Sequence, residues 1–86
     1  MYRVVVHRRS ARYLKKLPPD QRNRVKSVLE QMRDDPAGLV EVKRMVGNWA
    51  GYCRVRVGDI RILFWGDDSE RIVFVDHIGQ RGDIYK

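Results

Sequence analysis

Hydrophobic and polar residues alternate along the chain with two different periods, and each period predicts a different kind of element. Residues 2–7 (YRVVVH) are rich in β-branched and aromatic types, which predicts a first strand. Alternation with a period of two returns at 51–57, 60–65 and 71–77, so these segments are also predicted to be strands. Residues 39–46 (LVEVKRMV) are a short extended stretch of ambiguous type.

The segment that follows the first strand has the period of a helix instead. Ser10 is expected to cap a first helix, which Pro18-Pro19 must end. Pro19 suits the first turn of a second helix, whose apolar stripe consists of Val25, Val28, Leu29 and Met32. The resulting order, β-α-α-β-β-β, predicts an α+β fold with two N-terminal helices packed on one face of a mainly antiparallel sheet.

The stretch RVRVGDIR (54–61) has the pattern of a β-hairpin with Gly58-Asp59 as its two-residue turn. In that register Arg56 lies directly across from Arg61, and like charges opposed on a sheet cost on the order of 0.2–1 kcal/mol. Arg54 lies on the same face, two residues along from Arg56. The hairpin therefore places three cations on one patch of the sheet.

The two faces of this hairpin are predicted to differ. One face is apolar and suited to packing under the helices; it consists of Cys53, Val55, Val57, Ile60, Ile62 and Phe64. The opposite face carries Tyr52, Arg54, Arg56, Arg61, Leu63 and Trp65. A solvated face with ion pairs is one explanation of the arginines, but Asp59, in the turn, is the only acid of the hairpin. A surface that binds the phosphates and bases of single-stranded nucleic acid is therefore favoured.

Composition narrows the class of protein. The chain has 86 residues with 43% hydrophobic content, as expected for one globular domain spanning 1–86. It has no apolar run of membrane-spanning length, no signal peptide and a single cysteine, so we expect a cytoplasmic protein without membrane association. Its formal charge is +7, with ten Lys/Arg against two acids (net +8) in 1–33 and eight against nine (net −1) in 34–86. This excess of positive charge favours an anionic partner.

Several chemistries have no motif in the sequence. Two histidines and one cysteine give no zinc-type spacing, and there is no glycine-rich phosphate loop or Gly-x-Ser-x-Gly, so neither a metal nor a cofactor is expected. By alternation His77 shares a face with Val73 and Val75, which favours a packed histidine over a catalytic one. His7 is interpreted as structural.

The runs KRMVGNWAGYCRVRVGDIRILF and HIGQRGDIY resemble the RelE/ParE superfamily of small bacterial and archaeal toxins, and the order of elements matches along the whole chain. The hairpin is shared with gyrase-directed ParE-like members, whereas Arg81 and Tyr85 favour the RelE-like branch of mRNA interferases. This resemblance implies the toxin of a type II toxin–antitoxin system, neutralised by a RelB-like antitoxin. The RelE-like branch in particular implies a ribosome-dependent endoribonuclease that cleaves mRNA in the ribosomal A site and inhibits translation.

The resemblance also implies roles for individual residues. Arg61 would hold the scissile phosphate, Arg81 would protonate or stabilise the leaving 5′-oxygen, and Tyr85 would stack on or orient the RNA. Arg54 and Arg56 stand where the best-known RelE-type enzymes have lysines, and an arginine cannot act as a base. Tyr85, Lys43, His77 and water stay open as the base. Further RNA-binding positions are expected at Lys43, Arg44, Tyr52 and Trp65.

The implied reaction is a metal-independent attack of the ribose 2′-hydroxyl on the adjacent phosphate. Two other functions stay open: inhibition of DNA gyrase by a ParE-like toxin without nuclease activity, and a catalytically degenerate protein that only binds RNA or an antitoxin. The basic surface of residues 8–33 is either a solvated helical face or a surface that docks on ribosomal RNA.

Overall fold

The computed structural model describes residues 1–39 and 42–80 of the chain. Its elements follow the order β1 (Arg3–Val6), α1 (Arg8–Lys16), α2 (Pro19–Asp34), η1 (Pro36–Gly38), β2 (Lys43–Arg44), η2 (Gly47–Trp49), β3 (Cys53–Val57), β4 (Ile60–Asp67) and β5 (Ile72–Gln80). The predicted α+β class and the predicted order of helices and strands are confirmed. The ambiguous stretch at 39–46 contributes an additional strand, β2, of only two residues.

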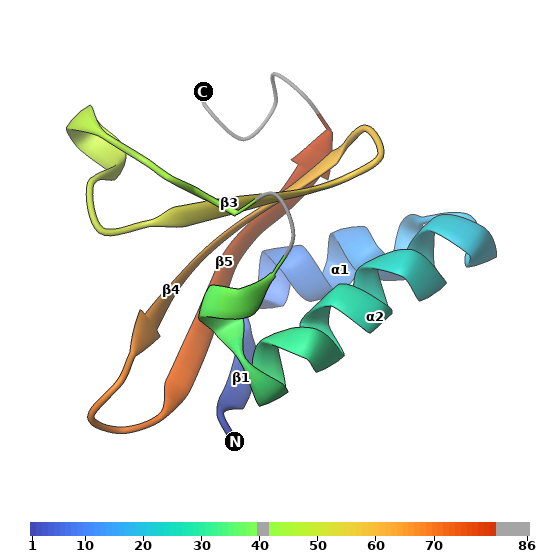
Figure 1. Cartoon of the computed structure of the whole chain (residues 1–86). Helices are drawn as coiled ribbons and strands as arrows, with labels where there is room; N and C mark the ends of the chain where they lie inside the picture. Colours follow the sequence, from blue (N-terminus) through green and yellow to red (C-terminus); the bar gives the residue numbers. More distant parts are fainter. Residues whose placement is uncertain (40–41, 81–86) are drawn as a thin grey trace.

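The strands form one sheet in the order β1-β5-β4-β3-β2, so that β4 is its central strand. Strand β1 pairs with β5 in parallel, and the three other pairs are antiparallel. Figure 1 shows both long helices, α1 and α2, on the same side of this sheet. We call the face of the sheet that α1 and α2 do not cover the open face.

The two helices begin and end for local reasons. The Nδ1 atom of His7 accepts a hydrogen bond of 3.2 Å from the backbone N–H of Arg9 and so caps α1. The prediction that Ser10 is the cap was wrong, because Ser10 lies inside α1, is buried, and donates its hydroxyl to the carbonyl of Asp76 at 2.9 Å. Helix α2 begins at Pro19, as predicted, and ends at Asp34.

The hydrophobic core lies between the helices and the sheet. From α2, Val25 and Met32 are fully buried, whereas Val28 and Leu29 are partly buried at its margin. The sheet contributes Val55, Val57, Ile60, Ile62, Phe64, Val73, Val75 and Ile78. The predicted apolar stripe and the predicted apolar face of the hairpin are therefore confirmed.

The turn between β3 and β4 requires a glycine. Gly58 has a φ of 61°, and Asp59 is not among the described residues with positive φ, which is the combination found in a type II′ turn. A Cβ added to Gly58 would lie 3.4 Å from a guanidinium nitrogen of Arg24 on α2. The turn fixes the register of the hairpin, and the register fixes which side chains reach the open face.

We expect Gly58→Ala to destabilise the fold by about 1 kcal/mol, because a left-handed backbone conformation is unfavourable for a residue with a Cβ. For a chain of this size that corresponds to a fall in the thermal midpoint of about 5 °C. Gly66→Ala is the matched control, since the nearest atom to its added Cβ is the carbonyl oxygen of Ile72 at 3.9 Å and its φ is not positive. Equal midpoints for the two variants in a thermal melt would contradict this account of the turn.

Candidate functional site

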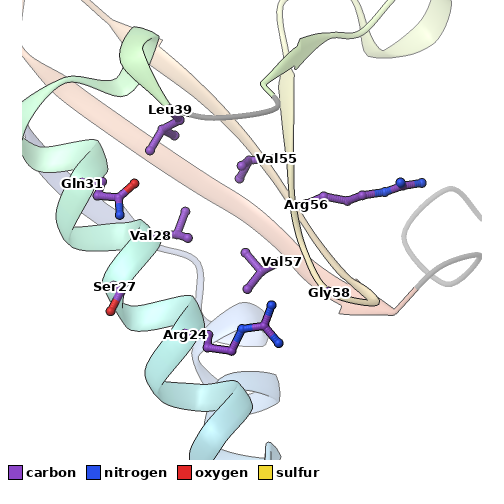
Figure 2. A pocket seen from close by; sticks show the side chains of 9 residues that line it. All are labelled: Arg24, Ser27, Val28, Gln31, Leu39, Val55, Arg56, Val57 and Gly58. Atoms are coloured by element: carbon purple, nitrogen blue, oxygen red, sulfur yellow. The ribbon is translucent and has the colours of Figure 1, made fainter.

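The open face of the hairpin carries the three arginines predicted for it. Strands β3 and β4 pair in the predicted register, with Val57 across from Ile60 and Arg56 across from Arg61. Figure 2 shows Val55 and Val57 pointing toward α2, where they line a hollow of about 420 Å³, while Arg56 points away from the helix. Alternation along β3 thus separates the core from the cationic surface.

The three arginines differ in exposure. Arg56 is exposed, Arg54 is half-buried, and Arg61 is only 9% exposed on the central strand. Arg61 has Arg56 on one side and Gly79 on the other. Arg61 is therefore the innermost cation of the surface. A recessed guanidinium with a second one directly across can hold a phosphate by parallel hydrogen bonds.

Two further predicted RNA-binding positions lie on β2, and alternation separates them. Lys43 pairs with Arg54 and extends the cationic row on the open face. Arg44 pairs with Cys53 and therefore belongs to the other face, where it lines a separate hollow together with Phe64. The structure brings Lys43 to the arginines and does not bring Arg44 there.

Trp65 lies on the open face but belongs to a different part of it. Its ring stacks on Phe74 of β5, with centroids 4.4 Å apart and ring planes at 21°. Trp65 lies four positions along β4 from Arg61, a span of roughly 13 Å in an extended strand. Trp65 is thus part of an aromatic pair distant from Arg61. Arg81 and Tyr85 lie outside the described residues, so their predicted roles stay predictions.

A β-bulge in β5 changes the position of His77. Phe64 pairs with Val75 and its neighbour Leu63 pairs with His77, so Asp76 is an extra residue on β5. The prediction that His77 shares a face with Val73 and Val75 was wrong, because the bulge shifts the alternation by one residue. His77 lies instead in the row of Leu63 and Arg54, on the open face.

Side chains from three parts of the chain meet at this bulge, and we call them the bulge cluster: Arg9, Trp49, Tyr52, Asp76 and His77. The hydroxyl of Tyr52 donates a hydrogen bond of 2.5 Å to the carboxylate of Asp76. The ring of Trp49 stands edge-on to Tyr52 and to His77, with centroid distances of 5.4 and 5.6 Å. Tyr52, predicted to bind RNA, therefore has its hydroxyl engaged within the protein.

Helix α1 is hydrogen-bonded to the same bulge. The Nε–H of Arg9 and the hydroxyl of Ser10 both donate to the backbone carbonyl of Asp76, at 3.1 and 2.9 Å. A terminal nitrogen of Arg9 lies 3.0 Å from Nε2 of His77. Burial and the neighbouring Arg9 cation lower the pKa of His77 below its usual value. The ring is therefore neutral at pH 7.

Arg9, Trp49 and Asp76 were not predicted as site residues. Asp76 had a signal in the sequence, because the buried residues Val73, Val75 and Ile78 are spaced by two and then by three. That change of spacing is the mark of one inserted residue in a strand. Arg9 is one of many basic residues of the N-terminal region, and its sequence context does not distinguish it.

Two properties of the described residues bear on other classes of site. Among residues 1–39 and 42–80, no group of three or more His, Cys, Asp or Glu side chains could hold a metal ion. In the same part of the chain no helix has both the length and the apolar character that a membrane crossing requires.

A known protein matches nearly the whole chain. The sequence is 31% identical over 87 residues to the predicted toxin RelE1 of Methanocaldococcus jannaschii, and the alignment covers 99% of this chain and 96% of that protein. No profile of a known protein family matches the sequence.

Solved structures share the fold. A chain of the RelBE2 toxin–antitoxin complex from Mycobacterium tuberculosis matches with a TM-score of 0.81 at 26% identity, covering 93% of this chain and 98% of that one. A chain of the RelE–RelB complex from Pyrococcus horikoshii matches with a TM-score of 0.82 at 22% identity and coverages of 95% and 97%. The isolated RelE toxin of Escherichia coli gives 0.77 at 19% identity, with coverages of 99% and 92%.

The fold is therefore the α+β fold of the solved RelE proteins. The similarity to RelE1 along almost the whole length makes the assignment specific: the chain belongs to the RelE toxin family.

We expect Tyr52→Phe to destabilise the protein, because the carboxylate of Asp76 loses its hydroxyl donor in a partly buried position. About 1 kcal/mol is expected for this hydrogen bond after allowance for solvent. The hydrogen bond to Asp76 raises the pKa of Tyr52 above 10.0, so its contribution is complete below pH 10 and is lost as pH rises through the raised value.

Tyr2→Phe is the control, since the Tyr2 hydroxyl makes the same bond to Asp68 at 2.8 Å on the exposed surface. Thermal melts at pH 7 and pH 9 measure both variants. A Tyr2 variant that loses as much stability as the Tyr52 variant would show that the bulge cluster does not stabilise the fold.

Proposed function

We propose that the single domain 1–86 is the toxin of a type II toxin–antitoxin pair and acts in the cytoplasm as an endoribonuclease. It cleaves mRNA in the ribosomal A site without a metal ion. The observation that carries this proposal is the cationic open face, in which Arg56 and Arg61 are directly paired and Arg54 and Lys43 form the next row.

Binding of the scissile phosphate is assigned to Arg61. Arg61 is the most buried of the three arginines, and the paired Arg56 adds a second planar donor on the same face. Arginine suits this role because it stays charged and donates two parallel hydrogen bonds. A phosphate between the two guanidinium groups would also relieve the repulsion of the cross-strand pair.

Cleavage follows from the charge that develops on the phosphate. The ribose 2′-hydroxyl gives its proton to a base, and its oxygen forms a bond to phosphorus as the bond from phosphorus to the 5′-oxygen breaks. The products are a 2′,3′-cyclic phosphate and a 5′-hydroxyl, whose oxygen takes up a proton. The phosphoryl oxygens gain negative charge in the transition state, and one positioned donor at such a site contributes about 3 kcal/mol, or roughly a hundredfold in rate. The ribosome, by holding the message, aligns the 2′-hydroxyl. Arg81 and Tyr85 are proposed to act on the leaving oxygen and on the orientation of the RNA.

A RelB-like antitoxin is the proposed protein partner. The solved relatives from M. tuberculosis and P. horikoshii are toxin–antitoxin complexes, which supports this assignment. A net charge of +7 favours a partner of opposite charge.

We expect Arg61→Ala to reduce message cleavage by about a hundredfold, because the recessed phosphate donor is lost. Growth arrest on induction and primer extension of a reporter transcript measure the effect. Arg33→Ala, an exposed cation at the end of α2, is the control with the same change in charge and should match the parent protein.

Two outcomes would contradict the proposed function or the proposed role of Arg61. One is growth arrest by the parent without cleaved transcripts but with inhibition of gyrase in a supercoiling assay, which would favour the ParE-like alternative. The other is equal cleavage by the parent and Arg61→Ala, which would remove Arg61 from the catalytic site.

The basic surface of α1 is proposed to dock on ribosomal RNA. Arg8 and Arg12 are exposed and lie one turn apart on this helix. Changing both to glutamine should weaken ribosome binding and flatten its salt dependence by about two units of log–log slope, since each arginine that neutralises a phosphate adds about one unit. Sedimentation with ribosomes over a salt series measures this slope, and an unchanged slope would mean that α1 is only a solvated face.

A further inference from the structure

The bulge cluster contains a histidine whose protonation state is set by its neighbours. Arg9 has only donors on its guanidinium, so the contact of 3.0 Å requires Nε2 of His77 to be the acceptor. A neutral imidazole with an accepting Nε2 carries its single proton on Nδ1. Arg9 is itself held in place by its bond to the carbonyl of Asp76.

Burial and the charges around His77 keep the ring neutral. From α1, the Arg9 cation and the nearby His7 oppose its protonation, and on β5 the Asp76 carboxylate favours it. Across the sheet, Arg54 and Arg61 add two more cations to the same face. Burial, the Arg9 cation and His7 outweigh the Asp76 carboxylate, so the pKa of His77 falls below its usual value.

The other ring nitrogen is available for a ligand. Among the described residues no acceptor for Nδ1–H is found, and no buried side-chain nitrogen or oxygen atom there lacks a partner, which is consistent with Nδ1 at the surface of the site. The edge-on Trp49 ring beside His77 adds an aromatic surface. One neutral donor and one aromatic ring thus lie next to a row of cations.

We propose that His77 is a specificity-determining residue that donates its Nδ1–H to an acceptor on an RNA base, and that Arg9 is a positioning residue that fixes the proton on Nδ1. This inference rests on the proposed function, because it assumes that RNA occupies the open face. A base acceptor is the better match than a phosphate, since phosphates are drawn to the neighbouring guanidinium groups and a neutral donor gains less from their charge. The base would lie beside Trp49 while its phosphate reaches Arg61.

The state of the ring can be measured without RNA. Nitrogen-15 NMR of the His77 ring in the free protein at pH 7.5 should show a protonated Nδ1 and an unprotonated Nε2. Arg9→Met removes the donor that fixes this tautomer, while Ser10 keeps its bond to the Asp76 carbonyl, so the ring signals should move toward the other tautomer and the pKa of His77 should rise. A protonated Nε2 in the parent, or unchanged ring signals in Arg9→Met, would overturn the positioning role.

Amide side chains test the donor itself. An asparagine can place its N–H near the position of Nδ1, whereas a glutamine reaches the position of Nε2.

The probes are short single-stranded RNAs with a 2′-O-methyl group at the cleavage site, so that they bind without reacting, and they differ in one base. His77→Ala should lower the ratio of affinities between the preferred and the other bases by about five- to tenfold, the effect of removing one hydrogen bond. His77→Asn should keep that ratio within about threefold of the parent, and His77→Gln should resemble alanine.

Three results would overturn the assignment. Equal base preference in the parent and His77→Ala would show that His77 does not read a base. A glutamine variant that restores preference as well as asparagine would show that Nδ1 is not the donor. Loss of cleavage of a ribosome-bound transcript by about a hundredfold in His77→Asn, with binding of the probes retained, would make His77 a proton-transfer group instead.

Failure of the proposed function gives a different result from failure of this inference. If RNA does not occupy the open face, Arg61→Ala binds the probes as the parent does. If only the role of His77 is wrong, binding depends on Arg61 but does not depend on residue 77.

Discussion

Pairing of β3 with β4 in one register is the constraint on which both the core and the site depend. Side chains alternate between the two faces of a strand, so burial of Val55 and Ile62 against α2 directs Arg56 and Arg61 to the open face. A slip of one residue would send the arginines into the core and the apolar residues to solvent. Gly58 fixes the register through its left-handed turn. The stability of the apolar face therefore holds the cations together on the other face.

The bulge in β5 determines which further side chains lie on that face. One inserted residue, Asp76, brings His77 into the row of Leu63 and Arg54 and gives α1 a carbonyl to which Arg9 and Ser10 bind. Leu63, although it lies on the open face, is fully buried. The open face thus combines a packed region around the bulge with a cationic region along β2, β3 and the start of β4. The packed region can hold a bound group in a fixed orientation, and the cationic region supplies positive charge.

The hairpin and its arginines could be predicted from sequence because their determinants are local. The dipeptide Gly58-Asp59 sets the turn, and alternation over a few residues on each side sets the faces. The bulge cluster depends on a contact between Arg9 and Asp76, residues 67 positions apart, which no local pattern predicts. Its one signal in the sequence is the changed spacing of the apolar residues in β5. The face of Arg44 followed from the pairing of β2, a strand of two residues, which is too short for a periodic signal.

The central claim is that the cross-strand pair of Arg56 and Arg61 is arranged for an RNA phosphate. Thermal unfolding of the parent and of Arg56→Gln, with and without a short 2′-O-methyl RNA, tests it most directly. Without RNA, the variant should be at least as stable as the parent, with a gain of up to about 1 kcal/mol from the relieved repulsion. With RNA, the thermal midpoint of the parent should rise more than that of the variant, because the parent binds more tightly. A variant that is less stable alone and gains as much from RNA as the parent would contradict the account.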